Sequence, residues 1–367
     1  MTPHLKQVVA QLLTEAPFGL TQGEKEARLL PALDELTREH YARCAEFRRV
    51  VEVVFGGLST LPYATMAELP FIPVSLFKRF ELRSVPPEET FRVLTSSGTT
   101  GQAVSRVVLD RDTATHQAHA LVRIMQQFVG KQRLPMVILD HPGVIKDRAS
   151  FSARGAGILG MMQFGRQPLY AFREDMSFDF EGVGKYLAAH AGQPVLFFGF
   201  TFMAWEHGVR ALRERNLRLN AANGVLIHSG GWKKLEAARV DAATFATGAR
   251  ETLGVGQVIN FYGMVEQVGS VFFENKLGAL QAPVFADVIV RDPFTLKPLP
   301  AGQRGLVQVI SILPHSYPGH SLLTEDLGEW IATDQPETGL GGRSFLVHGR
   351  APRSEIRGCS ETYVQPE

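Results

Sequence analysis

Thr95-Ser96-Ser97-Gly98-Thr99-Thr100-Gly101-Gln102 is the stretch that says most about the fold, because it interleaves hydroxyl residues with glycines. It follows Phe91-Arg92-Val93-Leu94, which is expected to be a strand. Glycine lets the backbone approach a ligand closely, and successive backbone N–H groups and hydroxyls can then hold phosphate oxygens. The stretch lacks the Gly-Lys-Ser/Thr ending of the ordinary P-loop and is not the dinucleotide fingerprint. It predicts a phosphate-binding loop, and the alternative is a plain Gly/Ser/Thr turn.

The composition is that of a globular protein with a large core. The chain has 367 residues, of which 45% are hydrophobic and 20% are charged, so it can form one large or two smaller domains. Its net charge of +1 gives no electrostatic argument for binding nucleic acid. No apolar run approaches the roughly 18–20 residues of a membrane span, and residues 1–16 lack the pattern of a signal peptide. We therefore expect a cytoplasmic protein with no nucleic-acid partner and no membrane span.

The two cysteines, Cys44 and Cys359, are expected to differ in role. They lie far apart in the sequence, and a disulfide is not expected in the cytoplasm. Cys44 belongs to a predicted apolar helix face and is interpreted as a core thiol. Two cysteines cannot form a zinc site alone, and the histidines lack ligand spacing, so no zinc site is predicted.

Three kinds of sequence follow one another along the chain. The first 55 residues carry apolar side chains at helical spacing, with Pro31 expected near a helix start or break rather than inside a helix. From about residue 90, short apolar strands alternate with helices, which predicts a sheet covered on both faces. After residue 283 the pattern predicts a smaller antiparallel β unit. The expected strands are 136–139, 195–198, 225–227, 258–261, 284–291 and 305–313, the expected helices are 202–216 and 233–253, and 339–342 is an expected hairpin loop.

Asn260-Phe261-Tyr262-Gly263-Met264-Val265-Glu266 overlaps the end of one of these strands. The Tyr262 ring offers a flat face on which a base can stack. Glu266 lies four residues later and is able to hold Mg²⁺ beside a bound nucleotide. The alternative is a buried tyrosine in a turn and a glutamate that faces a helix dipole.

Three further segments carry glycine-rich or charged patterns. His228-Ser229-Gly230-Gly231-Trp232-Lys233 suits either a ligand-binding loop or a strand-to-helix turn. Thr324-Glu325-Asp326-Leu327 is either an acidic β-turn or a ribose site, since a carboxylate can accept hydrogen bonds from both ribose hydroxyls. The segment 348–358 contains Arg350, whose directional donors suit ribose or phosphate oxygens; otherwise it is a solvated basic turn.

In their order and rough spacing over residues 90–358, these segments resemble the motifs of adenylate-forming enzymes, which join a carboxylic acid to AMP and consume ATP. The resemblance implies that Glu266 holds Mg²⁺ and that Tyr262 acts through its ring. It also implies that Asp326 contacts the ribose and that Arg350 contacts the ribose or a phosphate. The implied phosphate-loop residues are Ser96, Ser97, Gly98, Thr99, Thr100 and Gly101. Gly230 and Gly231 are implied to line the adenine, Tyr262 is implied to stack on it, and Gly263 is a further implied residue of the nucleotide site.

The chain departs from this family pattern at several positions. Val265 stands where the family has Thr, and Glu325 stands where it has Gly. Val104 occupies the place of the loop lysine, and Arg106, two residues later, is the candidate to support catalysis in its stead. Most family members continue into a mobile C-terminal domain with a lysine that drives adenylation, and we expect that domain to be absent here.

The segment Gly358-Cys359-Ser360-Glu361-Thr362 resembles the short tail of the acyl-protein synthetase family of bacterial bioluminescence, which activates a fatty acid for an acyl reductase. The resemblance implies that Cys359 accepts the acyl group. Arg353 and Arg357 lie close in sequence, and positive charge favours a nucleophilic thiolate. The alternative is an inert tail cysteine.

We therefore predict an α/β fold with the large-domain architecture of adenylate-forming enzymes, a helical N-terminal part and a small antiparallel β unit. The core is expected to span 1–349, with 1–89 largely helical, 90–282 α/β and 283–349 β-rich. Residues 350–367 are expected to form a hinge remnant and a mobile tail.

The predicted function is activation of a fatty acid as acyl-AMP with ATP and Mg²⁺, then transfer to Cys359 as a thioester for a partner acyl reductase. One alternative is a ligase that loads coenzyme A or another small thiol, as in the related phenylacetate ligases. The other is a nucleotide-binding module without turnover. The sequence does not set the acyl chain length, the partner or the oligomeric state.

Overall fold

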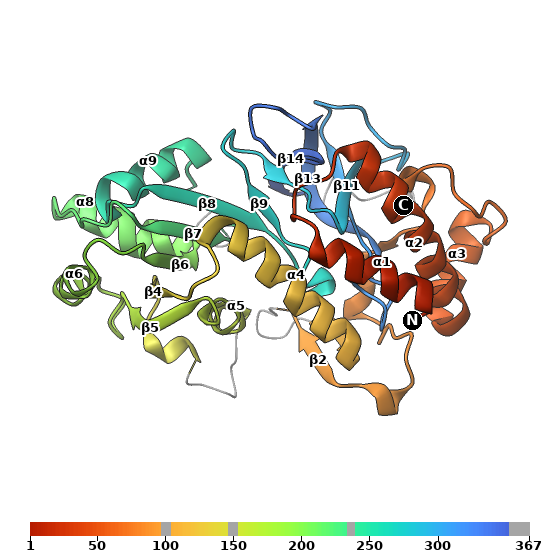
Figure 1. The fold of residues 1–367 in the computed structure, drawn as a ribbon, viewed down its shortest axis with the longest axis horizontal. Helices are drawn as coiled ribbons and strands as arrows, with labels where there is room; N and C mark the ends of the chain where they lie inside the picture. The colour runs from red at the N-terminus through yellow and green to blue at the C-terminus, as the bar shows by residue number, and fades with distance from the viewer. Residues whose placement is uncertain (97–103, 146–152, 233–238, 352–367) are drawn as a thin grey trace, which may run out of the picture.

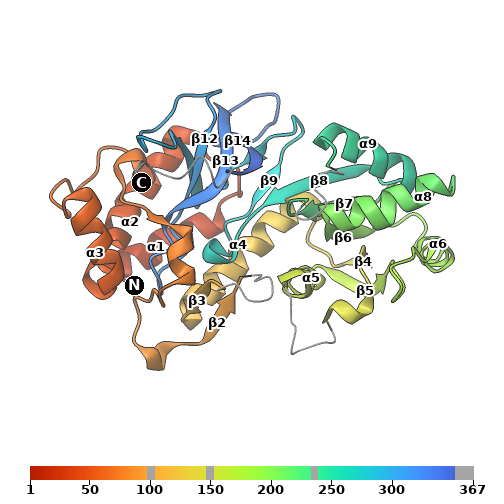
Figure 2. The same ribbon diagram turned by 180° about the vertical axis from the view of Figure 1, so that it is seen from behind.

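The computed structural model describes residues 1–96, 104–145, 153–232 and 239–351, and Figures 1 and 2 show it from opposite sides. The strands are β1 (Ile72–Pro73), β2 (Arg92–Thr95), β3 (Arg106–Leu109), β4 (Leu134–Ile138), β5 (Gly165–Tyr170), β6 (Leu196–Phe200), β7 (Val225–Ser229), β8 (Gln257–Tyr262), β9 (Phe272–Glu274), β10 (Leu280–Gln281), β11 (Ala286–Arg291), β12 (Gly305–Ser311), β13 (Ser321–Thr333) and β14 (Arg343–Arg350). The α-helices are α1 (Pro3–Thr14), α2 (Gln22–Arg43), α3 (Ala45–Phe55), α4 (Arg111–Val129), α5 (Ala153–Met162), α6 (Phe180–Ala189), α7 (Thr201–Met203), α8 (Ala211–Glu214) and α9 (Ala242–Leu253). Short 3₁₀ turns η1 (Met66–Glu68), η2 (Val74–Lys78), η3 (Pro87–Glu89), η4 (Pro142–Ile145) and η7 (Val265–Gln267) and the π-helix η5 (Ala204–Arg210) complete the described elements.

The first helices begin at side-chain caps. The Thr2 hydroxyl accepts from the backbone N–H of Leu5, and Thr21 forms a capping box with Glu24 at the start of α2, which satisfies backbone donors that a helix start leaves open. The expectation for Pro31 was wrong, because this residue lies inside α2. Pro31 is exposed, so water can satisfy the carbonyl it leaves free while the opposite face of α2 stays packed on the core.

One large mixed sheet runs through the molecule. Within the described residues its path has the order β11-β12-β13-β14-β10-β9-β8-β7-β6-β4-β5, and β1 pairs with β13. Strands β4 to β8 run parallel to one another, whereas β8 pairs with β9 in antiparallel fashion and the pairs along the path from there to β11 are antiparallel. The predicted antiparallel β unit is therefore a continuation of the α/β sheet. Strands β2 and β3 form a separate hairpin.

The parallel part of the sheet is covered on both faces, as its continuous apolar strands predict. Met136 and Ile138 of β4 belong to a core cluster that includes residues of α4 and α5. Val137, in the same strand, and Leu139, just after it, belong to a second cluster with residues of α6, α8 and α9. The alternation follows from the two-residue period of a strand.

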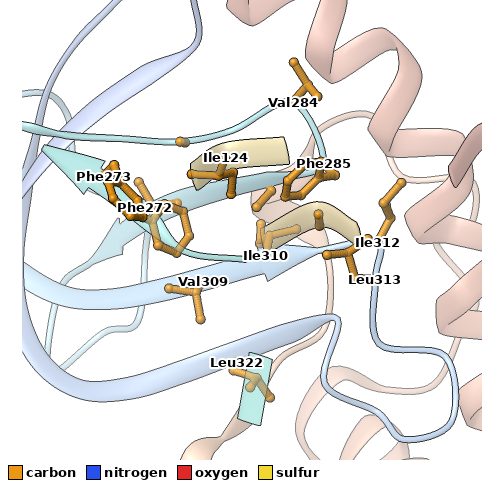
Figure 3. Packing of buried hydrophobic residues seen from close by; sticks show 14 of the residues in the cluster. Ile124, Phe272, Phe273, Val284, Phe285, Val309, Ile310, Ile312, Leu313 and Leu322 are labelled. Carbon is orange, nitrogen blue, oxygen red and sulfur yellow. The ribbon is translucent and has the colours of Figure 1, made fainter. Parts of the chain in front are cut away.

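The first core cluster continues without a break into the antiparallel part of the sheet and the N-terminal helices. Figure 3 shows Ile124 of α4 packed among buried residues that include Phe272 of β9, Ile310 of β12 and Phe285, which directly precedes β11. Helices α1 to α3 lie beside this end of the molecule, and α6, α8 and α9 lie at the other (Figure 1). Cys44 is 1% exposed within this cluster, as predicted for a core thiol.

The remaining differences from the predicted elements are local. The expected helix 202–216 is realised as α7, η5 and α8, with a π-helical middle. Of the expected helix 233–253, residues 233–238 lie outside the described residues, and α9 begins only at Ala242, after the Asp241 cap. The long strands β13 and β14 were not predicted as strands, whereas the loop 339–342 between them was predicted correctly.

Candidate active site

Two predicted site segments meet at one edge of the sheet. Strands β7 and β8 are parallel, with Ser229 opposite Phe261, so Gly230 and Gly231 leave the sheet beside Tyr262. The Ser229 hydroxyl donates to the Phe261 carbonyl at 2.7 Å and joins the two strand ends. Gly230 has a φ of 88°, and a Cβ there would come 3.1 Å from the Phe200 ring, so the backbone requires glycine at this position.

Tyr262 connects this edge to the antiparallel part of the sheet. Its hydroxyl donates a hydrogen bond of 2.7 Å to Oδ2 of Asp326 in β13. Its ring lies 6.2 Å from that of Phe272 and 6.3 Å from that of Phe345. Burial, together with the Asp326 carboxylate, raises the pKa of Tyr262 well above 10, so the phenol remains a donor. The motifs that contain Tyr262 and Asp326 are thus in contact, and the Tyr262 hydroxyl makes that contact.

Asp326 is held at its backbone as well as at its carboxylate. Its N–H donates to Oγ1 of Thr324 at 3.1 Å, and that hydroxyl donates to the Val307 carbonyl at 2.7 Å. Arg350 lies opposite Asp326 in the β13–β14 ladder. Its guanidinium is 76% exposed and lies 3.8 Å from Glu325, so it is available to a ligand at the surface.

Glu266 is a buried carboxylate in η7, with 6% of its surface exposed. Burial raises the pKa of Glu266, while the Ser105 hydroxyl and the charges of Lys78 and Arg350 act in the opposite direction. The Tyr317 hydroxyl donates to the Glu266 carbonyl at 2.9 Å and fixes the backbone of η7. The carboxylate is therefore influenced by polar and positive groups.

These surroundings suit a Mg²⁺ ion that is bound mostly through phosphate. No group of three or more His, Cys, Asp or Glu side chains able to hold a metal occurs in the described part of the chain. Mg²⁺ in nucleotide sites commonly keeps several waters and uses one or two carboxylates together with substrate phosphates. Glu266 can supply the one carboxylate that such a site needs.

The base of the predicted phosphate loop is a closed hairpin. Ser96 donates its N–H to the Ser105 carbonyl at 3.1 Å, and its hydroxyl accepts from the Ser105 N–H at 2.9 Å. The Ser105 hydroxyl lowers the pKa of Glu266, so the base of the hairpin lies beside the candidate metal ligand. The predicted loop residues Ser97, Gly98, Thr99, Thr100 and Gly101 lie outside the described residues, as does Cys359.

Arg106 is not brought into this cluster. It is exposed, and its guanidinium lies 3.8 Å from Glu81. Because successive side chains of an extended chain alternate in direction, Arg106 points away from the face of Ser105.

Gly263 follows Tyr262 directly, and a Cβ at this position would meet Val271 at 3.0 Å.

Sequence reasoning missed several residues that support the site. The Ser105 hydroxyl lowers the pKa of Glu266, the Tyr317 hydroxyl donates to the Glu266 carbonyl, and the Thr324 hydroxyl accepts from the Asp326 N–H. Thr324 lies within the segment quoted for Asp326, and Ser105 lies three residues after Gln102, so the hydroxyls in and beside the motifs are the signal that could have found them. Tyr317 lies 51 positions from Glu266 and Lys78 lies farther still, so only the fold brings them close to it.

The structural comparisons agree with this fold. A crystal structure of an open conformation of 2-hydroxyisobutyryl-CoA ligase in complex with 2-HIB-AMP and CoA aligns with a TM-score of 0.66 and 20% identity, over 89% of this chain and 70% of that one. The same ligase in the postadenylation state aligns with a TM-score of 0.67 and 19% identity, over 90% and 69%. This likeness confirms the predicted mixed α/β fold with a large sheet.

No helix in the described ranges is long and apolar enough to cross a membrane.

The sequence comparisons identify the family. Two relatives are described as long-chain-fatty-acid–luciferin-component ligases. The one from Aliivibrio fischeri is 24% identical over 345 residues, covering 89% of this chain and 86% of the relative. The one from Vibrio harveyi is 23% identical over 335 residues, covering 89% and 84%. The family model described as acyl-protein synthetase, LuxE, matches residues 5–366. The chain therefore belongs to the LuxE family of acyl-protein synthetases.

Proposed function

We propose that this protein activates a long-chain fatty acid with ATP and then carries the acyl group on Cys359. The single observation that carries the nucleotide part is the contact of Tyr262 with Asp326 at the carboxyl edge of β8, next to Glu266. Family membership and the names of the two relatives support a fatty acid as the substrate. Sites for ligands in open α/β sheets lie at this edge.

In the first half-reaction, a carboxylate oxygen of the fatty acid attacks the α-phosphorus of ATP. The new O–P bond gives acyl-AMP, and the bond to the bridging oxygen breaks so that pyrophosphate leaves. In this proposal the Tyr262 ring and residues Gly230, Gly231 and Gly263 receive the adenine, and Asp326 receives the ribose. The loop from Ser96 to Gly101 orients the phosphates, and Arg350 contacts the ribose or a phosphate.

Glu266 would hold Mg²⁺, which neutralises charge on the phosphates of ATP. Catalysis is then largely positioning and charge stabilisation. Lys78 and Arg350 have charges that act on Glu266, and they are better placed than Arg106 to add positive potential there. Arg106 would have to leave Glu81 before it could contact a phosphate.

In the second half-reaction, the Cys359 thiolate attacks the carbonyl carbon of acyl-AMP. A C–S bond forms, the bond from that carbon to the phosphate oxygen breaks, and AMP leaves; the thiol proton has passed to solvent. Cys44 is unsuited to this step, because burial raises the pKa of its thiol to about 11. A partner acyl reductase would then consume the thioester.

The chain length allows Cys359 to reach the site. The Ala351 N–H donates to the Glu325 carbonyl at 2.9 Å, directly beside Asp326. An extended chain spans about 3.3–3.6 Å per residue, so the residues from Ala351 to Cys359 can cover roughly 26–29 Å. This reach supports a tail that carries the acceptor thiol to the acyl-AMP.

Exchange of labelled pyrophosphate into ATP, measured with a panel of carboxylic acids, tests the first half-reaction. We expect exchange that depends on a long-chain fatty acid and on Mg²⁺. ATP binding without exchange, for every acid tested, would instead support the module without turnover.

Cys359→Ser tests the second half-reaction. Because Cys359 follows the last nucleotide motif, the variant should keep pyrophosphate exchange near the wild-type rate. It should lose the acyl label that neutral hydroxylamine removes from a thioester. Cys44→Ser is the matched control and should keep that label. If Cys359→Ser protein still acquires a hydroxylamine-labile acyl group, the tail-acceptor mechanism is wrong; label-free wild type with coenzyme A turnover would favour the small-thiol ligase.

A further inference from the structure

The geometry points to a second task for Tyr262: its hydroxyl positions the Asp326 carboxylate, so that one residue serves both the base and the sugar of the nucleotide. This inference rests on the proposed function and names what sets selectivity for ribose at that site. Sequence reasoning expected Tyr262 to act through its ring alone. The hydrogen bond of 2.7 Å to Oδ2 of Asp326 adds a contact that a phenylalanine would lack.

The hydrogen bond joins two strands that are not neighbours in the sheet. Strands β8 and β13 are separated by β9, β10 and β14. At the ordinary strand spacing of 4.7–4.9 Å, four steps of a flat sheet would amount to roughly 19 Å, which is too far for one side chain. The sheet must therefore curve here. Strand β10, between β9 and β14, has only two residues. The ring centroids of Phe272 in β9 and Phe345 in β14 are 5.1 Å apart.

Phe272 and Phe345 form the support on which the Tyr262 ring lies. A ring held by apolar neighbours at two sides keeps few rotamers. The hydroxyl is therefore aimed at Asp326 before any ligand arrives. Such preorganisation reduces the entropy that ordering a contact residue costs on binding.

Asp326 keeps acceptor capacity for a ligand while it is held. Oδ2 accepts from Tyr262, and Thr324 fixes the backbone N–H. Within the described residues, no donor is hydrogen-bonded to Oδ1. A carboxylate with one oxygen engaged and the other open is suited to a ribose hydroxyl, because an ionised acceptor makes a strong, directional hydrogen bond.

Tyr262→Phe tests this positioning role, since it keeps the ring and deletes only the hydroxyl. The measurement is kcat/KM of pyrophosphate exchange with ATP, 2′-deoxy-ATP and 3′-deoxy-ATP. The wild type should prefer ATP over at least one deoxy analogue. In Tyr262→Phe that preference should fall by about fivefold or more, the scale of a weakened hydrogen bond to a charged group, while activity with the disfavoured analogue changes little. A merely structural role would lower activity with all three nucleotides alike.

Two further variants make the outcome decisive. In an Asp326→Asn background, Tyr262→Phe should cause no additional change in the ribose preference, because the group it positions is altered already. Tyr186→Phe is the matched control: its hydroxyl donates to the Gln167 carbonyl at 2.8 Å at the β4–β5 end of the sheet, and its loss should leave the preference unchanged.

Two results would overturn the inference. One is a wild-type ribose preference that persists in Tyr262→Phe. The other is tighter ATP binding in Tyr262→Phe, which would mean that the hydroxyl competes with the ribose for Asp326. A wild-type protein without ATP-dependent exchange would refute the proposed function itself and this inference with it, so the two failures are distinguishable.

Discussion

Glu266 combines burial with a charge that its proposed role requires. Burial raises its pKa above the ordinary glutamate value, so the carboxylate takes up a proton at a higher pH than an exposed glutamate would. Metal binding needs the ionised form. The neighbouring positive charges do not remove the cost of desolvation, and a bound cation would relieve it.

The first prediction concerns this carboxylate. The Mg²⁺ concentration that half-saturates pyrophosphate exchange should increase as the pH falls from 8 to 6, because a raised pKa brings protonation of Glu266 closer to neutrality. Glu266→Gln should raise that concentration about tenfold or more, since a charge-assisted contact is worth roughly 1.5–3 kcal/mol, and should flatten its pH dependence.

Asp326→Ala is the control for Glu266→Gln. It should raise the KM for ATP without moving the half-saturating Mg²⁺ concentration. An unchanged requirement for Mg²⁺ in Glu266→Gln would remove Glu266 from the metal site.

The sequence singles out the three central candidate residues, Tyr262, Glu266 and Asp326, but it could not predict the partners that the structure gives them. Tyr262, Glu266 and Asp326 occur in short motifs whose spacing is local. Their contacts depend on non-local folding: Tyr262 meets Asp326, 64 positions later, only because the sheet curves. Arg106 was selected because it lies near the position of a missing lysine, but strand alternation directs it to Glu81.

Among the elements, α2 is tied to the sheet by a buried ion pair. Lys25 in α2 and Asp287 in β11 lie 3.4 Å apart and are almost fully buried. Desolvation lowers the pKa of Lys25. Desolvation also opposes ionisation of Asp287, but the charges of Lys25 and Arg343 and hydrogen bonds from Gln22 and Val288 together outweigh it and lower its pKa. Removing one partner would leave a buried charge poorly compensated.

The second prediction follows from this pair. Lys25→Met should destabilise the protein by about 3 kcal/mol, near the lower end for a broken buried pair, because Gln22 still donates to Asp287 at 2.6 Å. Urea unfolding monitored by fluorescence measures the change. Lys185→Met removes an exposed partner of Glu181 and should leave the midpoint unchanged. Equal midpoints for both variants would contradict a stabilising role for the buried pair.

The strands were predictable where the sequence has short, continuous apolar runs. The apolar strands at β4, β6, β7 and β8 follow directly from their sequence. Strand β13 was missed because Thr324, Glu325 and Asp326 suggest a turn, and only its pairing with β12 and β14 makes this polar stretch extended. Pro31 was misjudged because tertiary packing of α2 outweighs the local cost of a proline.

At the scale of the whole molecule, the segment 313–320 joins parts that are distant in sequence. It connects β12 to β13 and is buried throughout. Pro314 accepts from His40 of α2 at 3.2 Å, and the Ser316 hydroxyl donates to the Val108 carbonyl of β3 at 2.9 Å. Tyr317 contacts Glu266. The N-terminal helices, the β2–β3 hairpin and the candidate metal ligand therefore meet at one junction.

This junction is rich in neutral histidines. His40 and His320 stack with ring centroids 4.9 Å apart, and His116 lies 3.2 Å from His315. Burial lowers the pKa of His40 and of His315 to about 3, and burial lowers that of His320 well below 6.5. A second histidine beside each ring makes protonation still less favourable.

The last prediction is acid instability that begins above the range of carboxylate titration. Each histidine has a folded pKa below its unfolded value of about 6.5, so the unfolded chain binds more protons and stability falls as the pH drops below 6.5. Each group contributes about 1.4 kcal/mol per pH unit well below that value. For His40, His315 and His320 together the loss at pH 5 is roughly 6 kcal/mol, comparable to the total stability of many domains. Urea midpoints between pH 7 and 5 measure it, and His119→Gln, at an exposed site on α4, should leave the slope unaltered. A midpoint independent of pH over this interval would mean that the junction opens or protonates without unfolding, and the histidines would then not couple pH to the integrity of the site.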